Sequence, residues 1–387
     1  MSSHLPPRRP RVAYLITNSE VGGAQAHVAD LLNALHGRVD AVVLAGGDGP
    51  LFDAAQSRGA NTIRLTLLDN ALSPRRALSA FKQLIAALRT TKPDLIHAQS
   101  AKAGALGRLA GWVLGIPVVY TVHGFAFKPA APLRQRLVAR VVEWILAPLT
   151  ARMICVAEAE RAMANTLPIA SKRVSVIRNG IADTTAAPAV PGAAVVRIVM
   201  VARLAAPKRP DLVIRAFAQA TLPDCELVLA GDGPQMEALS ALADAVAPGK
   251  VRFLGAIPDV PSLLASAQIF VLASDHEGFP LSILEAMRAG LPIIASDLPG
   301  IREQLADGSC GRLVPASDVQ AWAETLAQLA ANGAERERLG NDARQYWEQH
   351  FGMGNMADAT WQVYQEVLVH RGANHSEQPL QEQTGHE

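Results

Sequence analysis

Short runs of β-branched and aliphatic residues alternate with longer helical patterns from Arg11 to Val314. This alternation limits the fold more than any other feature, because strands joined by helices pair in parallel and need helices on the faces of their sheet. The expected fold class is therefore α/β. At 387 residues the chain is too long for one ordinary core, so two domains are expected.

The strand patterns fall into two groups, separated by a stretch rich in Ala, Pro, Gly and Thr at residues 182–194. In the first group we expect strands at Val12–Thr17, Ala41–Leu44, Thr62–Leu65, Asp94–Ala98, Val118–Val122, Met153–Val156 and Val174–Ile177. In the second group we expect strands at Arg197–Val201, Glu226–Leu229, Val251–Leu254, Ile269–Leu272, Pro292–Ala295 and Arg312–Val314. Each group predicts a doubly wound domain, and two facing domains leave a ligand cleft at the carboxyl ends of their strands.

The domain boundaries follow from these groups. We expect a disordered N-terminus at 1–10, an N-terminal domain at 11–181, a linker at 182–194, a C-terminal domain at 195–350, a helix at 351–371 that packs back across the domains, and a disordered tail at 372–387. Each domain has a strand that runs into the sequence GDGP, at Gly47–Pro50 and Gly231–Pro234. We interpret this as two similarly built halves.

Charge and cysteine content exclude several classes of protein. The 36 basic and 35 acidic residues are nearly balanced, which argues against bulk nucleic-acid binding. The three cysteines are far apart and odd in number, so they indicate a reducing cytosol and neither a disulfide framework nor a metal knuckle. The N-terminus lacks the apolar region of a secretory signal, and the best apolar stretch, Leu137–Leu149, is interrupted by Arg140 and Glu143.

The stretch SDHEGFPLSILEA, residues 274–286, carries the strongest chemical signal. Pro280 favours the first turn of a helix, whose unpaired amides attract phosphate. Glu285 lies about one turn into that helix, where it can accept hydrogen bonds from a ribose diol, and Glu277 precedes the helix. An isolated pair of carboxylates would more often be part of a solvated helix.

Two basic residues are expected at the same edge of the second sheet. Arg203 follows the strand pattern IVMV, and Lys208 precedes the next helical pattern. Two cations there would neutralise a diphosphate and stabilise it as a leaving group. Taken alone, the pair fits surface charges on a loop equally well.

The motifs VARLAAPKRPDLVIRAF, LAGDGP, VRFLG and SDHEGFPLSILEAMRAGLPIIASDLPG, in this order, resemble the C-terminal half of the retaining glycosyltransferases of family 4. The resemblance covers nearly the whole ordered chain and is most specific over residues 197–315. It implies a GT-B fold, in which two Rossmann-like domains face a central cleft, the N-terminal one on the acceptor side and the C-terminal one binding the nucleotide sugar. It also implies that Arg203 and Lys208 bind the donor diphosphate, Glu285 the ribose, and that Glu277 lies near the transferred sugar.

The first half matches this family more loosely. Its glycine-rich loop corresponds to GGAQAHV, and HAQSAKAGALGRLAG and VVYTVHGFAF resemble bacterial enzymes that build exopolysaccharides and lipid-linked oligosaccharides. His123 matches a residue that contacts the donor sugar, whereas His27 and His97 are weaker candidates. Ala157 stands where the family often has Ser, which weakens either a helix cap or an acceptor contact near Glu158 and leaves the role of Glu158 open. The candidate catalytic residues are His123, Arg203, Lys208 and Glu277, and the candidate donor-binding residues are Gly22, Gly23, Arg203, Lys208, Gly231, Gly233, Glu277, Gly278, Phe279, Pro280, Leu281 and Glu285.

The resemblance implies a metal-independent transfer without a cofactor or a protein nucleophile. A hexose or N-acetylhexosamine would move from a nucleotide diphosphate sugar, with UDP as the favoured nucleotide, to a saccharide acceptor. The acceptor is expected to be linked to a lipid such as undecaprenyl diphosphate, in the biosynthesis of bacterial surface polysaccharides, including exopolysaccharide and lipopolysaccharide.

Four other interpretations remain open at this point. Asp275 and Glu277 fit a DxE metal site, although further oxygen ligands are not evident. A nicotinamide dehydrogenase shares the doubly wound architecture, but neither GDGP loop extends to GxGxxG. A hydrolysing nucleotide-sugar epimerase and a non-catalytic glycosyltransferase-like partner subunit also fit the architecture.

The segment Leu133–Leu149 suggests contact with a membrane. On a helix its Arg136, Arg140 and Glu143 form a polar stripe, and a broad apolar stripe contains Leu133, Leu137, Val138, Val141, Trp144 and Ile145. Nearby basic residues outnumber acidic ones: Lys128, Arg134, Arg136, Arg140 and Arg152 against Glu143. We expect either a crossover helix packed on its sheet or a peripheral contact with the anionic inner face of the cytoplasmic membrane.

Overall fold

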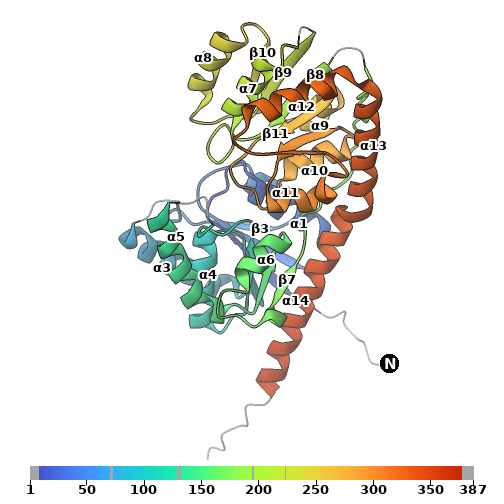
Figure 1. Ribbon diagram of the computed structural model, residues 1–387. Coiled ribbons are helices and arrows are strands. Elements are labelled where there is room, and N and C mark those ends of the chain that lie inside the picture. Colours follow the sequence, from blue (N-terminus) through green and yellow to red (C-terminus); the bar gives the residue numbers. More distant parts are fainter. Residues whose placement is uncertain (1–7, 70–72, 129–131, 194–195, 223, 377–387) are drawn as a thin grey trace, which may run out of the picture.

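The computed structural model describes residues 8–69, 73–128, 132–193, 196–222 and 224–376. They form two α/β domains stacked one above the other (Figure 1). Every expected strand is present within one or two residues of its predicted bounds, so the predicted fold class is confirmed.

The N-terminal domain has a seven-stranded parallel sheet in the order β3-β2-β1-β4-β5-β6-β7. Its strands are β1 (Arg11–Ile16), β2 (Asp40–Ala45), β3 (Asn61–Arg64), β4 (Leu95–Ala98), β5 (Val118–Val122), β6 (Arg152–Cys155) and β7 (Val174–Val176). Its helices are α1 (Gly23–Ala34), α2 (Leu51–Gln56), α3 (Pro74–Thr91), α4 (Ala101–Leu114), α5 (Leu133–Leu146) and α6 (Glu158–Ala164). The strand order reverses direction between β1 and β4, which places a crevice at the carboxyl ends of these strands.

The C-terminal domain has a six-stranded parallel sheet in the order β10-β9-β8-β11-β12-β13. Its strands are β8 (Val196–Val201), β9 (Cys225–Ala230), β10 (Val251–Gly255), β11 (Ile269–Leu272), β12 (Ile293–Ser296) and β13 (Arg312–Val314). Its helices are α7 (Pro210–Gln219), α8 (Met236–Val246), α9 (Val260–Ala265), α10 (Leu281–Arg288), α11 (Pro299–Gln304), α12 (Val319–Ala331) and α13 (Gly333–His350). Here the order reverses between β8 and β11, so Arg203, Lys208 and Glu277 all follow strands at the reversal.

The last two helices tie the domains together (Figure 1). Trp347 of α13 is buried in the core of the C-terminal domain, whereas Tyr364 of α14 (Met353–Ser376) is buried in that of the N-terminal domain. Where α13 gives way to α14, Ile181 and Gly352 form a backbone bridge. The helix α14 therefore spans the junction and packs on α1.

Both chain ends differ from the expected disordered segments. Arg8, which was expected in the disordered segment 1–10, forms an ion pair of 2.8 Å with Asp94. At the other end α14 continues to Ser376, five residues into the segment expected to be a tail. Residues 1–7 and 377–387 lie outside the described part of the chain.

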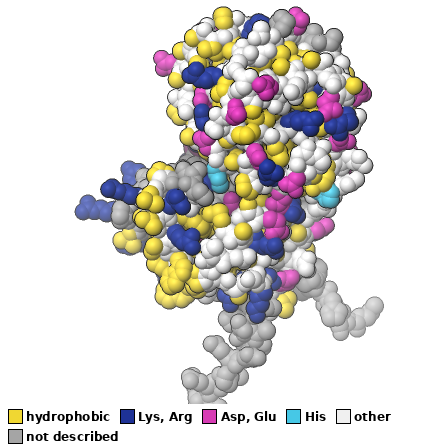
Figure 2. All heavy atoms as spheres, viewed as in Figure 1, with side chains coloured by type: hydrophobic (Ala, Val, Ile, Leu, Met, Phe, Trp, Pro, Cys, Tyr) yellow, Lys and Arg dark blue, Asp and Glu magenta, His cyan; other side chains and the backbone are white. Residues whose placement is uncertain are grey.

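The packing of helix α5 differs from the sequence prediction for both its polar and its apolar stripe. Glu143, expected on an exposed polar stripe, is buried in an ion pair with Arg108 of α4. The predicted apolar stripe is exposed instead, so the interpretation as a helix buried by that stripe is wrong. Arg152 pairs with Glu366 of α14 and does not belong to the basic group of α5. Figure 2 shows hydrophobic side chains gathered on the side of the N-terminal domain where α5 lies. Among the described residues, no helix has the length and apolar character needed to cross a membrane.

Candidate active site

The two GDGP loops fix the backbone that follows the first strand of each domain. A Cβ on Gly231 would lie 1.9 Å from the carbonyl oxygen of Ala202, and one on Gly233 would lie 2.3 Å from that of Leu204. In the N-terminal domain, a Cβ on Gly49 would lie 2.3 Å from the carbonyl oxygen of Ser19. Contact this close requires glycine. Gly231 and Gly233 thus hold the segment that carries Arg203.

Lys208 and Glu277 are brought together by a pairing of two loops. The backbone around Lys208 bridges to Ser274, and the amide of Asp275 donates to the carbonyl of Pro207 at 2.9 Å. The Lys208 ammonium and the Glu277 carboxylate then form an ion pair, with side chains only 18% and 10% exposed. Arg203 precedes this pair on an exposed turn, and its side chain has no hydrogen-bond or ion-pair partner among the described residues.

The carboxylates of the DxE metal interpretation are both engaged with cations. Asp275 accepts a 3.2 Å hydrogen bond from Arg209, and Glu277 is paired with Lys208. In the described ranges no group of three or more His, Cys, Asp or Glu could hold a metal ion. Both carboxylates of the DxE sequence are therefore occupied by basic side chains in this arrangement.

The loop between β11 and α10 meets the N-terminal domain directly. A Cβ on Gly278 would lie 2.3 Å from the carbonyl oxygen of His123, and the amide of Asn179 donates to the carbonyl of Phe279 at 2.8 Å. His276 faces Gly124 of the same N-terminal loop, and its buried Nε2 has no hydrogen-bond partner among the residues that the structure describes. The domains therefore touch within one residue of Glu277.

His123 is a neutral side chain at this contact. Its Nε2 lies 3.0 Å from Oε1 of Gln99, and its ring makes an edge-on contact with the ring of His27 at 4.8 Å. Burial lowers the pKa of His123 to about 4, because the charged form would be desolvated. Near neutral pH the imidazole can donate or accept a hydrogen bond but carries no charge.

The start of α10 lies at the same contact. Pro280 immediately precedes the helix, and no side chain caps the amides of its first turn. The carbonyl of Pro280 is held by the Gln304 side chain at 3.0 Å, which positions Leu281 and the first turn. Phe279 is buried against Phe351.

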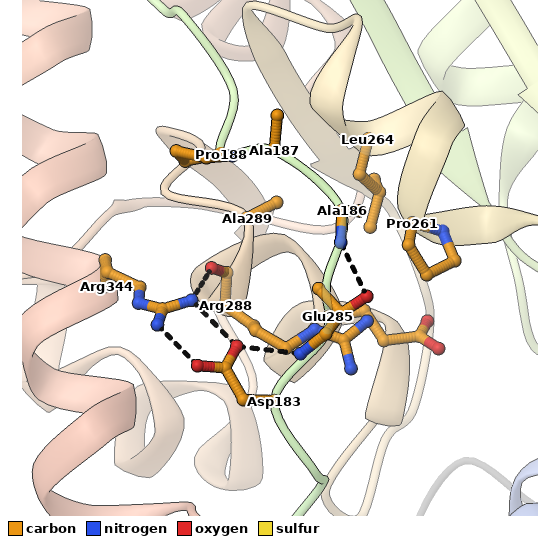
Figure 3. Close-up of a pocket in the computed structure, with 11 residues that line it drawn as sticks. Asp183, Ala186, Ala187, Pro188, Pro261, Leu264, Glu285, Arg288, Ala289 and Arg344 are labelled. Atoms are coloured by element: carbon orange, nitrogen blue, oxygen red, sulfur yellow. Dashed lines mark hydrogen bonds and ion pairs between the residues drawn. The ribbon is translucent and has the colours of Figure 1, made fainter.

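Glu285, on α10, lines a cavity of about 340 Å³ (Figure 3). The wall opposite α10 is formed by the linker. Asp183 of the linker forms a 2.8 Å ion pair with Arg344, and the carbonyl of Ala182 accepts a hydrogen bond from Arg288 of α10. Burial raises the pKa of Glu285 to about 7, Arg288 lowers it, and the negative charge of Asp30 on α1 raises it further. A carboxyl group in this environment is a strong hydrogen-bond acceptor only when the pH exceeds its pKa.

Gly22 and Gly23 lie at the start of α1, in the N-terminal domain. Gly22 has an extended backbone with φ near 178°, and a Cβ on Gly23 would meet no atom within 4 Å. Two turns further along the same helix, Asp30 interacts electrostatically with Glu285 and Arg288. Helix α1 therefore faces α10 across the domain boundary.

As predicted, the side chain of Ala157 does not cap the start of α6. A residue of the C-terminal domain caps this helix instead. No side chain of α6 caps the helix, and the amide of Glu158 instead donates to Oε2 of Glu303 on α11, at 2.8 Å. Glu303 also accepts a 2.6 Å hydrogen bond from Arg178. The Glu158 side chain forms an ion pair of 2.7 Å with Arg161.

Sequence reasoning missed three residues at this contact between the domains: Gln99, Asn179 and Glu303. Gln99 immediately follows β4, so its place at a carboxyl strand end was a usable signal. Asn179 and Glu303 act across the domain boundary, which no local pattern reveals. His97 is buried in hydrogen bonds with Thr121 and Tyr364, which explains it as a structural residue.

Comparison with known proteins identifies both halves. The family model described as Glycosyltransferase Family 4 matches residues 21–184, and that described as Glycosyl transferases group 1 matches residues 195–346. An Escherichia coli relative, UDP-Gal:alpha-D-GlcNAc-diphosphoundecaprenol alpha-1,3-galactosyltransferase, is 31% identical over 304 residues, which cover 73% of this chain and 77% of the relative. Alpha-maltose-1-phosphate synthase of Mycolicibacterium smegmatis is 28% identical over 386 residues, which cover 89% of this chain and 96% of the relative.

Solved structures share the fold at lower identity. Anabaena HepE, in complex with UDP and glucose, has a TM-score of 0.80 and 20% identity, covering 92% of this chain and all of that one. Sucrose-phosphate synthase from Thermosynechococcus elongatus has a TM-score of 0.79 and 21% identity, covering 94% of this chain and all of that one. With both domains matched and a relative above 30% identity, the chain belongs to glycosyltransferase family 4 and is a glycosyltransferase with the GT-B fold.

Proposed function

We propose that this enzyme transfers a hexose or N-acetylhexosamine from a UDP-sugar, with retention of anomeric configuration, to a saccharide carried on undecaprenyl diphosphate. The name of the Escherichia coli relative supports both substrate classes, since its donor is UDP-Gal and its acceptor a GlcNAc-diphosphoundecaprenol. The enzyme would act in surface polysaccharide biosynthesis at the cytoplasmic face of the inner membrane, in peripheral contact with anionic lipid.

The observation that carries this proposal is the Lys208–Glu277 pair beside the contact between the domains. A diphosphate placed there lies next to Lys208, near the exposed Arg203, and at the uncapped start of α10. These groups stabilise the negative charge that develops as the sugar departs. The ion pair with Glu277 orients the ammonium before the donor arrives.

In the proposed reaction the bond between the anomeric carbon and the diphosphate oxygen breaks while the acceptor hydroxyl attacks from the same face. The hydroxyl proton passes to the departing diphosphate, so no protein nucleophile is required. His123, a neutral group whose Nε2–H donates to Gln99, accepts a hydrogen bond from a sugar hydroxyl at Nδ1, and Glu277 accepts one from another sugar hydroxyl. Glu285 in its ionised form accepts hydrogen bonds from the ribose diol.

The test is a donor panel followed by product analysis. UDP-, GDP- and ADP-sugars are screened for an increase in thermal stability, because a donor that binds only the native state raises the melting temperature. The donor that binds is then incubated with and without a soluble GlcNAc-diphospho-lipid analogue, and the anomeric configuration of the product is read by NMR. Product from donor alone would instead indicate a hydrolysing epimerase, and an inverted product would contradict retention.

Activity is expected to survive EDTA. The reason is that Lys208 and Arg203 supply the positive charge that a divalent ion would otherwise bring, while Asp275 and Glu277 are already paired with cations. Initial rates are measured after dialysis against EDTA and again after adding Mg²⁺ or Mn²⁺. A complete loss that magnesium restores would support the metal interpretation of Asp275 and Glu277.

Replacing Glu285 by Gln should raise stability and weaken donor binding at once. In the native protein the pKa of Glu285 is about 7, well above that of an unfolded glutamate, so the native state binds more protons than the unfolded state between these values. The free energy of unfolding of the wild type therefore falls as the pH rises through about 4.5 to 7.

Glutamine carries no charge, so the variant lacks this penalty. At pH 8, without donor, it should be more stable than the wild type by about 1 to 3 kcal/mol, and the difference should vanish near pH 4. Denaturant unfolding at several pH values measures this, and calorimetry measures donor affinity, which should fall. The same pH dependence in both proteins would rule out a perturbed carboxyl at this position.

A further inference from the structure

Helix α5 presents its apolar side chains to the surroundings. Of its fourteen residues only Glu143 and Leu146 are buried. Six large apolar side chains of this helix are 56–66% exposed: Leu133, Leu137, Val138, Val141, Trp144 and Ile145. A helix in a soluble domain normally turns such a stripe toward the core, so this orientation needs a cause.

A buried ion pair fixes the orientation. Arg108 of α4 is fully buried and donates to both carboxylate oxygens of Glu143, at 2.8 and 3.0 Å. It also donates to the carbonyl of Gly104 at 2.8 Å and lies over the ring of Tyr120 at 4.5 Å. Rotating α5 to bury its apolar side would leave the Arg108 charge buried without a partner, which is strongly unfavourable.

Neighbouring α4 extends the apolar surface. It packs against α5 and exposes Trp112 by 70%, Val113 by 51% and Leu109 by 37%. We refer to these three residues and the six exposed apolar residues of α5 as the α4–α5 face. Large exposed apolar side chains gathered on two neighbouring helices mark a site of contact with a protein or a membrane. Figure 2 shows yellow side chains collected there, with basic side chains beside them.

The exposed charges on α5 are of one sign. Arg134 and Arg140 are exposed and Arg136 is partly exposed, and none of the three has an ion-pair partner among the described residues. The one acidic residue of the helix, Glu143, is occupied by Arg108. The aliphatic side chains and two tryptophans of the α4–α5 face therefore lie beside arginines that have no acidic partner among the described residues.

We propose that the α4–α5 face docks on an anionic lipid bilayer, with Trp112 and Trp144 at the level of the headgroups and the arginines of α5 against lipid phosphates. Apolar residues with flanking tryptophan and arginine are the composition of helices that lie in the membrane interface. A second copy of the chain fits less well, because a twofold contact would place two arginine rows against each other. The inference deepens the proposed function, resting on it only for the lipid-linked nature of the acceptor.

The test uses the full chain and vesicles without any donor or acceptor. Vesicles of phosphatidylglycerol and phosphatidylcholine should bind the protein in a salt-sensitive manner, whereas pure phosphatidylcholine vesicles should bind it weakly. Acyl-brominated lipids should quench the tryptophan fluorescence. The variant with Trp112→Phe and Trp144→Phe should lose that quenching, because the remaining tryptophans are wholly or largely buried: Trp322, Trp347 and Trp361. The triple change of Arg134, Arg136 and Arg140 to Gln should weaken binding to anionic vesicles roughly 100-fold.

A matched control separates local from global charge. Changing Arg215, Arg252 and Arg338 of the C-terminal domain to Gln removes the same charge from exposed sites away from the α4–α5 face, and should leave binding within about twofold. Equal binding to both vesicle types, or equal effects of the two triple changes, would overturn the proposal. So would a dimer in sedimentation that the α5 triple change dissociates. The Lys208→Ala variant should still bind vesicles, so a failed catalytic assignment leaves this result unaffected.

Discussion

Lys208→Ala is expected to lower kcat/KM by about 100- to 1,000-fold, and Arg203→Ala by a similar factor. Each change removes one charged hydrogen bond to a diphosphate that gains negative charge in the transition state, a contribution of about 3 to 4 kcal/mol. The Lys208 ammonium lies at the contact between the domains, where its side chain is only 18% exposed. A water molecule in the Lys208→Ala variant would therefore be a poor substitute for the ammonium. Steady-state kinetics with the donor identified by thermal shift would measure both effects.

The pairing with Glu277 requires controls for this experiment. Lys208→Ala leaves a largely buried carboxylate without its partner, so part of any effect could come from local rearrangement. The double variant Lys208→Ala, Glu277→Gln removes that charge and should recover the melting temperature but not the activity. Arg215→Ala, an exposed change on α7 in the same domain, should leave kcat/KM within about twofold. Near-normal turnover in both Lys208→Ala and Arg203→Ala would contradict their assigned role.

The fold was predictable because its determinants are local. Each buried parallel strand is a short apolar run, such as IFVL in β11, and each is bounded by a helical pattern. Once the strands are placed, the carboxyl ends of β8 and β11 must lie side by side, because parallel neighbours end at the same edge. The proximity of Lys208 and Glu277 follows from this geometry, although they are 69 residues apart.

Contacts between the domains were not predictable in this way. The cap on α6 comes from Glu303, which is 145 residues away from Glu158 and belongs to the other domain. Asn179 and Phe279 are 100 residues apart and meet only when the two domains are docked. No periodicity or motif within either segment encodes such a partner, so only the assembled structure reveals it.

The orientation of α5 was misjudged for a related reason. Hydrophobic periodicity indicates that a helix has a polar and an apolar face, but it does not determine which face packs against the domain. That choice depends on Arg108, which lies on a different helix and is itself fully buried. A buried arginine on α4 needs a partner of opposite charge, and Glu143 on the facing helix α5 provides that carboxylate.

Gly278→Ala is expected to lower kcat/KM by about 100-fold while leaving each domain folded. The added Cβ would lie 2.3 Å from the carbonyl oxygen of His123, about 1 Å closer than an ordinary contact, so the domains must separate at this point. The shift moves Glu277 and Lys208 away from the N-terminal groups that complete the site. A displacement of about 1 Å between reacting groups is sufficient for a loss of this size.

Two further glycines separate this effect from loss of the fold. Gly300→Ala places a Cβ 1.7 Å from the carbonyl oxygen of Gly278 within one rigid domain, where no separation can relieve it, so this variant should lose melting temperature as well as activity. Gly354→Ala, in α14, meets no atom within 4 Å and should change neither. Because the clash at Gly278 is between domains, its variant should keep a melting temperature within a few degrees of the wild type. Full activity of Gly278→Ala would show that catalysis does not need the contact between His123 and the Glu277 loop.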